Sequence, residues 1–381
     1  MSHGQHDVLI IGAGVIGLSL AWELSNRGKT VHVIDANLPG REASWAGGGI
    51  LPDANLQYAL DPLDKLRGLS QQLHPIWAER LKIETGIDNH FEVCGGVHVA
   101  RRTGEAAALA GLLATLPAEG IAVEKLNSQQ LRKLEPALDP DQFLAAYYLP
   151  NDALLRNPRH LQALVAACEK NGVLITPHCA VTDIPIDLGH IHSVPSPQGS
   201  LRAKQICITA GAWSAMLLQQ LNIENGIVPI RGQMLLYQAA AGTINRVINE
   251  GSRYVIPRRD GHILVGSCEE EVGFEKGTTP QMLDQLADFA GQLIPPLNGL
   301  EIKQSWSGLR PASFDGMPYL GRITAADNLF IAAGHFRSGL HLSPATAVVM
   351  ADLMTGDTPA IDISHFSILR NNNTPEGLSP V

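Results

Sequence analysis

The sequence has little charge, and its positive charge is not concentrated in any segment. Charged residues make up 17% of 381 positions, and 28 Lys and Arg against 37 Asp and Glu give a formal net charge of -9. A protein that binds a polyanion normally presents clustered Lys and Arg side chains. Because no such cluster is seen, we expect no nucleic-acid partner.

Cysteine and histidine patterns typical of a disulfide framework or a metal site are also missing. The five cysteines form an odd set without a CxxC pair, and no spacing among the 14 histidines indicates a metal site. We therefore expect no metal and no disulfides. The cysteines are predicted to be buried thiols in a reducing cytoplasm; they are Cys94, Cys168, Cys179, Cys207 and Cys268.

No apolar run has the features of a targeting or membrane segment. The run VLIIGAGVIGLSLAWEL, which begins at Val8, has no basic segment before it and no A-x-A-like cleavage site near its end. It is also too short and too rich in glycine for a membrane span. We therefore expect a cytoplasmic protein.

Two kinds of secondary-structure pattern are present. Residues 7–35 predict strand, glycine turn, helix and strand, because a continuous apolar run is followed by apolar residues at helical spacing and then by TVHVID. Further helices are predicted over 63–81, where Pro75 should kink or split the helix, over 157–172 with Asn157 as the cap, and through Pro344 to Leu353. The segments GGVHVA, AAYYLP and GQMLLYQ, and a hairpin turning at Asp260-Gly261, resemble antiparallel strands.

The order of these patterns predicts two interleaved domains, as the length of the chain allows. The fold class is α/β plus α+β, with a discontinuous Rossmann-like dinucleotide-binding domain and an antiparallel-sheet domain. The predicted segments are 1–87, 150–218 and 303–366 for the first domain, 88–149 and 219–302 for the second, and 367–381 for a loose C-terminal tail.

Gly12, Gly14 and Gly17 form a GxGxxG pattern between the first strand and helix, and Asp35 ends the second strand. The first glycine permits the turn, the second lets a pyrophosphate approach the backbone, and the third lets helix and strand pack closely. The helix N-terminus then faces the phosphates, and the Asp35 carboxylate accepts hydrogen bonds from the ribose hydroxyls. The pattern predicts a dinucleotide, but does not separate FAD from NAD.

Three consecutive glycines, Gly47 to Gly49, follow in REASWAGGGILP, with Arg41 and Ser44 beside them. Such a run is costly in conformational entropy, so a sharp turn or a close ligand must compensate. Its position just past the strand that carries Asp35 favours a ligand.

Several motifs together resemble one family. They are the GxGxxG turn, REASWAGGGILP, ITAGAWS (208–214), PIRGQ (229–233), SGLRPASFDGMPYLGR (307–322) and GHFRSGLHLSPAT (334–346). In this order, over nearly the whole chain, they resemble the D-amino-acid oxidase and sarcosine oxidase family of FAD-dependent oxidoreductases, and within it the glycine oxidases of thiazole (thiamine) biosynthesis.

The resemblance implies FAD as the cofactor, with the antiparallel domain binding substrate over the flavin. Some family members attach flavin through a cysteine in the C-terminal block; no cysteine follows Cys268, so we expect non-covalent FAD. The implied cofactor residues are Gly12, Gly14, Val15, Ile16, Gly17, Asp35, Ala36, Arg41, Ser44, Gly47, Gly48, Gly49, Ile50, Val181, Ala210, Gly211, Trp213, Gly308, His335, Arg337, Ser338, Gly339 and Leu340.

The resemblance also implies the substrate residues. Arg310 matches the principal clamp for a substrate carboxylate, a role that suits the planar guanidinium fork. Tyr254 matches a tyrosine that reaches the same carboxylate. Arg337 is left with three roles, which are the flavin, the substrate carboxylate or a structural carboxylate. The run Glu269 to Glu271 is predicted to be solvated.

The implied reaction is oxidation of a small amino acid, chiefly glycine, with hydride transfer from Cα to the flavin and hydrolysis of the imine to the 2-oxo acid and ammonia. Oxygen would reoxidise the flavin and give hydrogen peroxide. A homotetramer and transfer of glycine imine to thiazole synthase are implied as well. The alternatives are a sarcosine, D-amino-acid or D-proline oxidase or dehydrogenase, and a flavin subunit of a larger complex.

Overall fold

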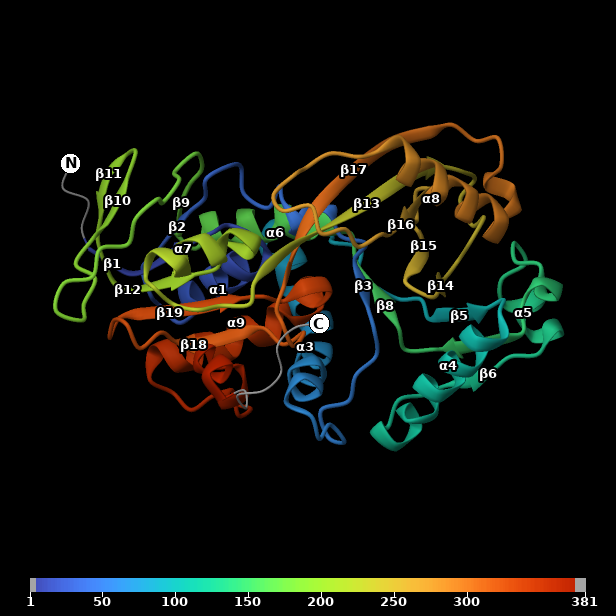
Figure 1. Ribbon diagram of the computed structural model, residues 1–381, viewed down its shortest axis with the longest axis horizontal. Helices are drawn as coiled ribbons and strands as arrows, with labels where there is room; N and C mark the ends of the chain where they lie inside the picture. The colour runs from blue at the N-terminus through green and yellow to red at the C-terminus, as the bar shows by residue number, and fades with distance from the viewer. Residues whose placement is uncertain (1–4, 374–381) are drawn as a thin grey trace.

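The computed structural model describes residues 5–373 and contains two large sheets at opposite ends of the long axis (Figure 1). The first sheet has six strands, and every neighbouring pair is parallel except the β18–β19 edge. Their spatial order is β18 (Tyr319–Arg322), β19 (Leu329–Ala333), β12 (Ala203–Ile208), β1 (His6–Ile11), β2 (Val31–Ile34) and β9 (Leu174–Thr176).

Alternating side chains of the six-stranded sheet pack into two separate cores. Val8 and Ile10 of β1 join one core, and Leu9 and Ile11 join the other. The first core is completed by α1 (Val15–Asn26), α3 (Pro62–Thr85), α6 (Asn157–Lys170) and α9 (Gly339–Thr355), and the second by α7 (Ser214–Gln220) and residues near 179–194. Burial on both faces explains the continuous apolar runs in these strands.

The second sheet has eight strands and lies under one helix, α8 (Pro280–Leu293). Val255 of this sheet packs toward α8, while Tyr254 and Ile256 lie on the opposite face. The strands, in spatial order, are β17 (Ile302–Ala312), β13 (Val228–Gln238), β16 (His262–Gly266), β15 (Arg253–Pro257), β14 (Val247–Glu250), β5 (Gly96–Ala100), β7 (Ala145–Leu149) and β6 (Glu124–Lys125).

These sheets confirm the predicted fold class and the predicted hairpin at Asp260-Gly261. The second sheet is antiparallel except where β14 pairs with β5 in parallel, an exception that the sequence pattern did not predict. Strand β17 extends this sheet beyond the predicted domain boundary at residue 303, because its whole length pairs with β13. The division into domains stays a prediction.

Two predicted helix features can be compared with the structure. Pro75 does not split α3, which is continuous, because this proline lies on the exposed side of the helix, where a lost backbone hydrogen bond costs least. Asn157 is the first residue of α6, and Arg156 occupies the cap position. The Asn157 side chain instead donates a hydrogen bond to the Ser44 carbonyl oxygen at 2.9 Å. This bond ties α6 to the segment that precedes the three glycines.

Short elements connect the two sheets and flank them. The α-helices among them are α2 (Ala43–Ala46), α4 (Thr103–Ala114) and α5 (Ser128–Leu134). One small sheet consists of β3 (Ile50–Leu51), β8 (Ala153–Leu154) and β4 (Glu92–Val93), and another of β10 (Val194–Ser196) and β11 (Gly199–Leu201). The 3-10 helices are η1 (Leu116–Glu119), η2 (Pro140–Gln142), η3 (Gly211–Trp213), η4 (Pro295–Leu297), η5 (Phe336–Ser338), η6 (Ser364–Phe366) and η7 (Ile368–Asn373). Within residues 5–373, every helix is too short or too polar to cross a membrane.

The first residues of the predicted loose tail pack against the rest of the chain. Ile368 is buried, and Arg370 in η7 binds the Asp315 carboxylate through two nitrogens at 2.7 and 3.0 Å. The rest of the predicted tail, from residue 374, lies outside the described residues.

Candidate active site

The glycine turn between β1 and α1 is shaped by close backbone contacts. Gly12 has a φ of +114°, and a Cβ built on it would lie 2.5 Å from the Thr209 carbonyl oxygen. A Cβ on Gly17 would lie 2.0 Å from the Gly12 carbonyl oxygen. Side chains at these two positions would push the turn, β12 and α1 apart. Gly14 lies at the N-terminus of α1 and faces a cavity, an arrangement that suits a pyrophosphate.

Asp35 lies at the end of β2, beside this turn. Its two carboxylate oxygens accept hydrogen bonds from the backbone N–H groups of Ala13 at 2.7 Å and Asn37 at 2.8 Å. Burial raises the pKa of the Asp35 carboxyl, and the two amides act against that shift. Each oxygen keeps a lone pair for a further donor. The carboxylate also lines the cavity, so it is placed to bind ribose hydroxyls.

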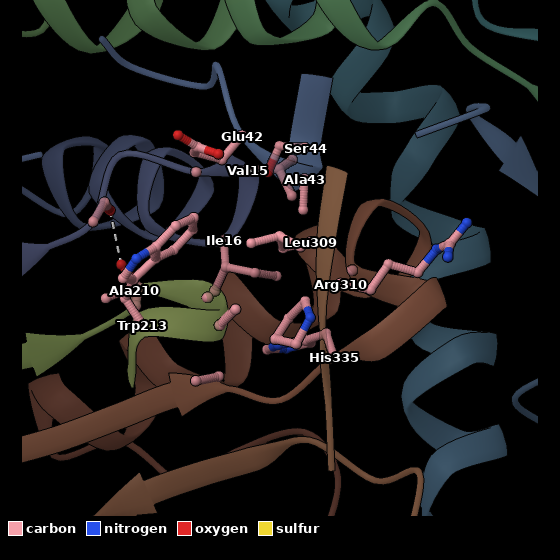
Figure 2. A pocket seen from close by; sticks show the side chains of 18 of the residues that line it. Val15, Ile16, Glu42, Ala43, Ser44, Ala210, Trp213, Leu309, Arg310 and His335 are labelled. Carbon is pink, nitrogen blue, oxygen red and sulfur yellow. Dashed lines mark hydrogen bonds between the residues drawn. The ribbon is translucent and has the colours of Figure 1, made fainter. Parts of the chain in front are cut away.

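The cavity has a volume of about 670 Å³ and extends from the glycine turn to β17 and the start of α9. Figure 2 shows part of its lining, with residues from α1, α2, η3 and β17 around one space. It brings together most of the predicted site residues: Gly12, Gly14, Val15, Ile16, Asp35, Ala36, Ser44, Gly47, Gly48, Gly49, Ile50, Val181, Ala210, Gly211, Trp213, Tyr254, Arg310, His335, Arg337, Ser338, Gly339 and Leu340.

Three predicted cofactor residues lie outside the cavity lining. Gly17 supports the turn from behind, as described above. Gly308 of β17 faces α2, where a Cβ would lie 2.6 Å from the Ala46 Cβ, so this glycine allows helix and strand to pack. The Arg41 side chain is exposed. Two of these positions therefore have a packing reason for their residue type.

The three-glycine run lies against β15. A Cβ on Gly48 would lie 2.6 Å from the Ile256 Cδ1, and a Cβ on Gly49 would lie 2.1 Å from the Leu155 carbonyl oxygen. Gly49 also has a φ of +80°. The run thus presents bare backbone to the cavity with no space for side chains behind it.

Arg258 supports the glycine run and was missed by the sequence analysis. Its guanidinium donates to the carbonyl oxygens of Gly48 at 2.7 Å and Leu155 at 3.0 Å. It is buried, and burial lowers its pKa to about 10. The sequence signal was the first of two adjacent arginines in YVIPRR, and this pattern does not distinguish a buried side chain from an exposed one.

Arg310 of β17 is held by neutral groups. It donates to the Cys268 carbonyl oxygen at 2.9 Å and to the Ser267 hydroxyl. No carboxylate of the described residues forms an ion pair with it. The guanidinium lies over Gly232, where a Cβ would come within 2.3 Å of its nitrogens. Figure 2 shows Arg310 and Leu309 on opposite sides of the strand.

Arg337, in η5, has a carboxylate partner. Its guanidinium lies 2.9 Å from a Glu269 carboxylate oxygen and 3.4 Å from the Ser252 carbonyl oxygen. Three roles were predicted for Arg337, which are binding the flavin, the substrate carboxylate or a structural carboxylate. In the described residues, Arg337 pairs with a carboxylate of the chain itself, that of Glu269. Both side chains are roughly half exposed, at 40% and 44%.

The prediction of a solvated run at Glu269 to Glu271 agrees with the exposure of Glu269 and Glu271 and is wrong for Glu270, whose side chain is 22% exposed. Glu269 binds Arg337, as described. Glu270 binds Arg231 through two contacts of 3.1 Å and accepts from Gln233 at 2.8 Å. The Arg231 hydrogen bonds hold the pKa of the Glu270 carboxyl at about 2. Glu271 is exposed and makes no recorded side-chain contact within residues 5–373.

Tyr254 and His335 complete the polar lining. Among residues 5–373, the Tyr254 hydroxyl has the Met234 sulfur, a weak acceptor at 3.6 Å, as its hydrogen-bond partner. The His335 ring lies 3.1 Å from the Thr346 hydroxyl, and burial lowers its pKa to about 3. His335 is therefore neutral at physiological pH. Further lining residues that were not predicted include Asn37, Glu42, Cys179, Thr209, Asn249, Gly334 and His341.

Comparisons with known proteins agree with this geometry. Residues 7–353 match the family described as "DAO: FAD dependent oxidoreductase". The chain is 36% identical to a glycine oxidase of Pseudomonas putida, over 95% of this chain and 98% of that protein. It is 30% identical to a bifunctional protein ThiO/ThiG of Trichormus variabilis, over 96% of this chain but only 55% of that protein.

A solved structure gives the same result for the fold. The crystal structure of glycine oxidase from Geobacillus kaustophilus superposes with a TM-score of 0.91 at 30% identity, covering 96% of this chain and 99% of that chain. The similarity of fold therefore extends over nearly the whole of both chains. With the family match over residues 7–353, it shows that the chain belongs to the FAD-dependent oxidoreductases of the DAO family.

Proposed function

We propose that this protein oxidises glycine, and with it other small amino acids, using FAD and molecular oxygen. The observation that carries this proposal is Arg310, a guanidinium in the cavity lining whose protein partners are a carbonyl and a hydroxyl. Its charge is not neutralised by a carboxylate of the described residues. A substrate carboxylate is the ligand that such a fork prefers.

FAD fits the other end of the cavity. Gly14 and the N-terminus of α1 would hold the pyrophosphate, and Asp35 would hold the ribose. The Gly47–Gly49 run would lie against the ring system with bare backbone, because a Cβ on Gly48 would collide with Ile256 and one on Gly49 with the Leu155 carbonyl oxygen. When bound, FAD supplies the electron acceptor for the hydride that leaves the substrate Cα. Since no cysteine follows Cys268, we propose non-covalent binding.

The residues of the chain would position the amino acid rather than react with it. Arg310 would bind the carboxylate in bidentate geometry, and the Tyr254 hydroxyl would donate a further hydrogen bond to it. The Met234 sulfur competes weakly for that proton, so the hydroxyl is available. Because His335 is neutral, it adds no positive charge that would disfavour an amine. The amine reacts in its neutral form, and no side chain needs to act as a base.

The product is an imine, which water converts to glyoxylate and ammonia, while oxygen takes the two electrons and becomes hydrogen peroxide. The bifunctional relative contains a further region beyond the part that matches this chain. This supports our proposal that the imine passes to a thiazole synthase. We further propose that the reaction takes place in the cytoplasm. We also propose a homotetramer, on the resemblance to glycine oxidases alone.

Anaerobic reduction of the bound flavin tests the proposal. The visible spectrum is followed after glycine, sarcosine, D-alanine or D-proline is added, and then air is admitted. Rapid bleaching by glycine, with return of colour and formation of peroxide, is expected. Bleaching only by a larger substrate, or no reoxidation by air, would assign the protein to another activity in the family. Flavin in the supernatant after acid precipitation would establish the non-covalent cofactor.

A further inference from the structure

One short segment contacts both arginines of the cavity lining. Ser267 and Cys268 bind Arg310, and the next residue, Glu269, binds Arg337. The two guanidiniums differ in charge balance, because Arg310 has neutral partners and Arg337 has a carboxylate. The cavity therefore contains two possible carboxylate sites, one open and one neutralised by the chain itself.

The position of Glu269 is fixed from both sides. Gly266 pairs with Met234 of β13, and Glu270 exchanges two backbone hydrogen bonds with Arg231, at 2.9 and 3.1 Å. The Glu270 side chain is bound to Arg231, while the Glu269 side chain reaches Arg337. Since both ends of the segment are anchored, Glu269 is held beside Arg337 rather than placed there by a mobile loop.

We propose that Glu269 is a specificity-determining residue that restricts the site to amino acids with a single carboxylate. This inference rests on the proposed function and deepens it by defining the substrate class. A second carboxylate on a substrate held by Arg310 would need Arg337 as its partner. It would have to displace Glu269 and would meet the negative charge of Glu269 in doing so.

The effect should be moderate. Arg337 and Glu269 are 40% and 44% exposed, and ion pairs with that exposure are screened and weak. The pair therefore disfavours a second carboxylate without excluding it. Replacement of Glu269 by glutamine removes the like charge and keeps the shape, which leaves Arg337 available to a dianion.

Two unreactive ligands separate binding from turnover. Glycolate has one carboxylate, and oxydiacetate has two at the spacing of iminodiacetate. Each is titrated at low ionic strength into the FAD-loaded full chain, and the flavin absorption gives Kd. Wild type, Glu269→Gln, Glu271→Gln and the double variant Glu269→Gln/Arg337→Gln are compared. Glu271 is the matched control, because it is an exposed glutamate two residues away without a recorded partner.

We expect Glu269→Gln to lower the Kd of oxydiacetate about fourfold and that of glycolate less than about twofold. Glu271→Gln should change the ratio of the two constants little, and the double variant should lose the gain. The ratio of kcat/KM for iminodiacetate to that for glycine should rise in parallel in Glu269→Gln. That increase would show that the binding preference extends to turnover.

Equal shifts in Glu269→Gln and Glu271→Gln would overturn the inference, because the effect would then be net charge alone. An unchanged ratio in Glu269→Gln, with glycine still reducing the flavin, would overturn it and leave the proposed function intact. If wild type binds neither ligand and glycine does not reduce the flavin, both the inference and the proposed function fail.

Discussion

The two sides of the cavity bind their ligands by different means. On the side of the six-stranded sheet, much of the lining is glycine backbone, at Gly12, Gly14 and the Gly47–Gly49 run, where an added Cβ would come close to neighbouring atoms. On the side of the eight-stranded sheet, the lining has the charged and polar side chains Arg310, Arg337 and Tyr254. Recognition of the cofactor therefore depends on the absence of side chains, whereas recognition of the substrate depends on which partners a side chain already has.

This difference predicts different responses to substitution. A change on the backbone side should act through steric overlap and abolish cofactor binding. A change on the side-chain side should alter substrate affinity in graded steps and leave FAD bound.

Gly12→Ala should have the largest effect. A Cβ there would lie 2.5 Å from the Thr209 carbonyl oxygen, on a residue with a φ of +114°. We expect purified protein with little or no FAD, measured by the ratio of flavin to protein absorbance. Gly111→Ala is the control, since a Cβ in that exposed part of α4 meets nothing within 4 Å. Full flavin content in Gly12→Ala would contradict the steric account of this side.

Low pH should have the second-largest effect, because it should lower the stability of the folded protein and release the flavin. Burial lowers the pKa of four histidines, namely His74 of α3 (to about 4), His160 of α6 and His335 just before η5 (both to about 3) and His341 of α9 (well below 6.5). They are neutral when folded and protonate on unfolding at about pH 6.5, so their contribution is full above that pH and is lost below it. As the pH falls below about 6.5, each of these histidines lowers the free energy of unfolding by about 1.4 kcal/mol per pH unit, until the pH reaches its pKa in the folded state.

The measurement is the midpoint of thermal unfolding between pH 7 and pH 5, followed by circular dichroism and by release of flavin fluorescence. Both midpoints should fall together as the pH is lowered. His74→Gln should flatten the dependence, and substitution of His192, which is 68% exposed, should not. A midpoint that stays constant to pH 5 would refute the assignment of these histidines as neutral.

Arg310→Ala should have the largest effect on the side-chain side. Loss of the guanidinium removes about 2–5 kcal/mol of interaction with the substrate carboxylate if the pair is desolvated, and kcat/KM for glycine falls accordingly. FAD content should stay at the wild-type level, in contrast to Gly12→Ala. Steady-state kinetics and the flavin spectrum measure both quantities. Wild-type kcat/KM in Arg310→Ala would remove this residue from the site.

Tyr254→Phe should have the smallest effect. The ring packing in the cluster with Met234 and Ile256 is kept, and only the hydroxyl is lost. A hydrogen bond to a charged group contributes about 1.5 kcal/mol, so kcat/KM for glycine should fall about tenfold with no change in unfolding temperature. A fall in stability without a kinetic effect would instead indicate a structural role.

The sequence by itself determined the local parts of this protein. The strand–turn–helix–strand of residues 7–35, the Asp260-Gly261 hairpin and the GxGxxG pattern could be predicted, because each depends on neighbours along the chain. The family motifs extended this to most of the residues that line the cavity.

Only the tertiary structure decided how the charges are paired. Glu269 with Arg337, Glu270 with Arg231, and Arg258 with the Gly48 carbonyl join residues 68, 39 and 210 positions apart. The tertiary structure likewise decided that β14 pairs with β5 in parallel, since these strands lie far apart in the sequence. A charged residue has the same local pattern whether it is solvated or paired, so its partner follows only from how distant segments are brought together.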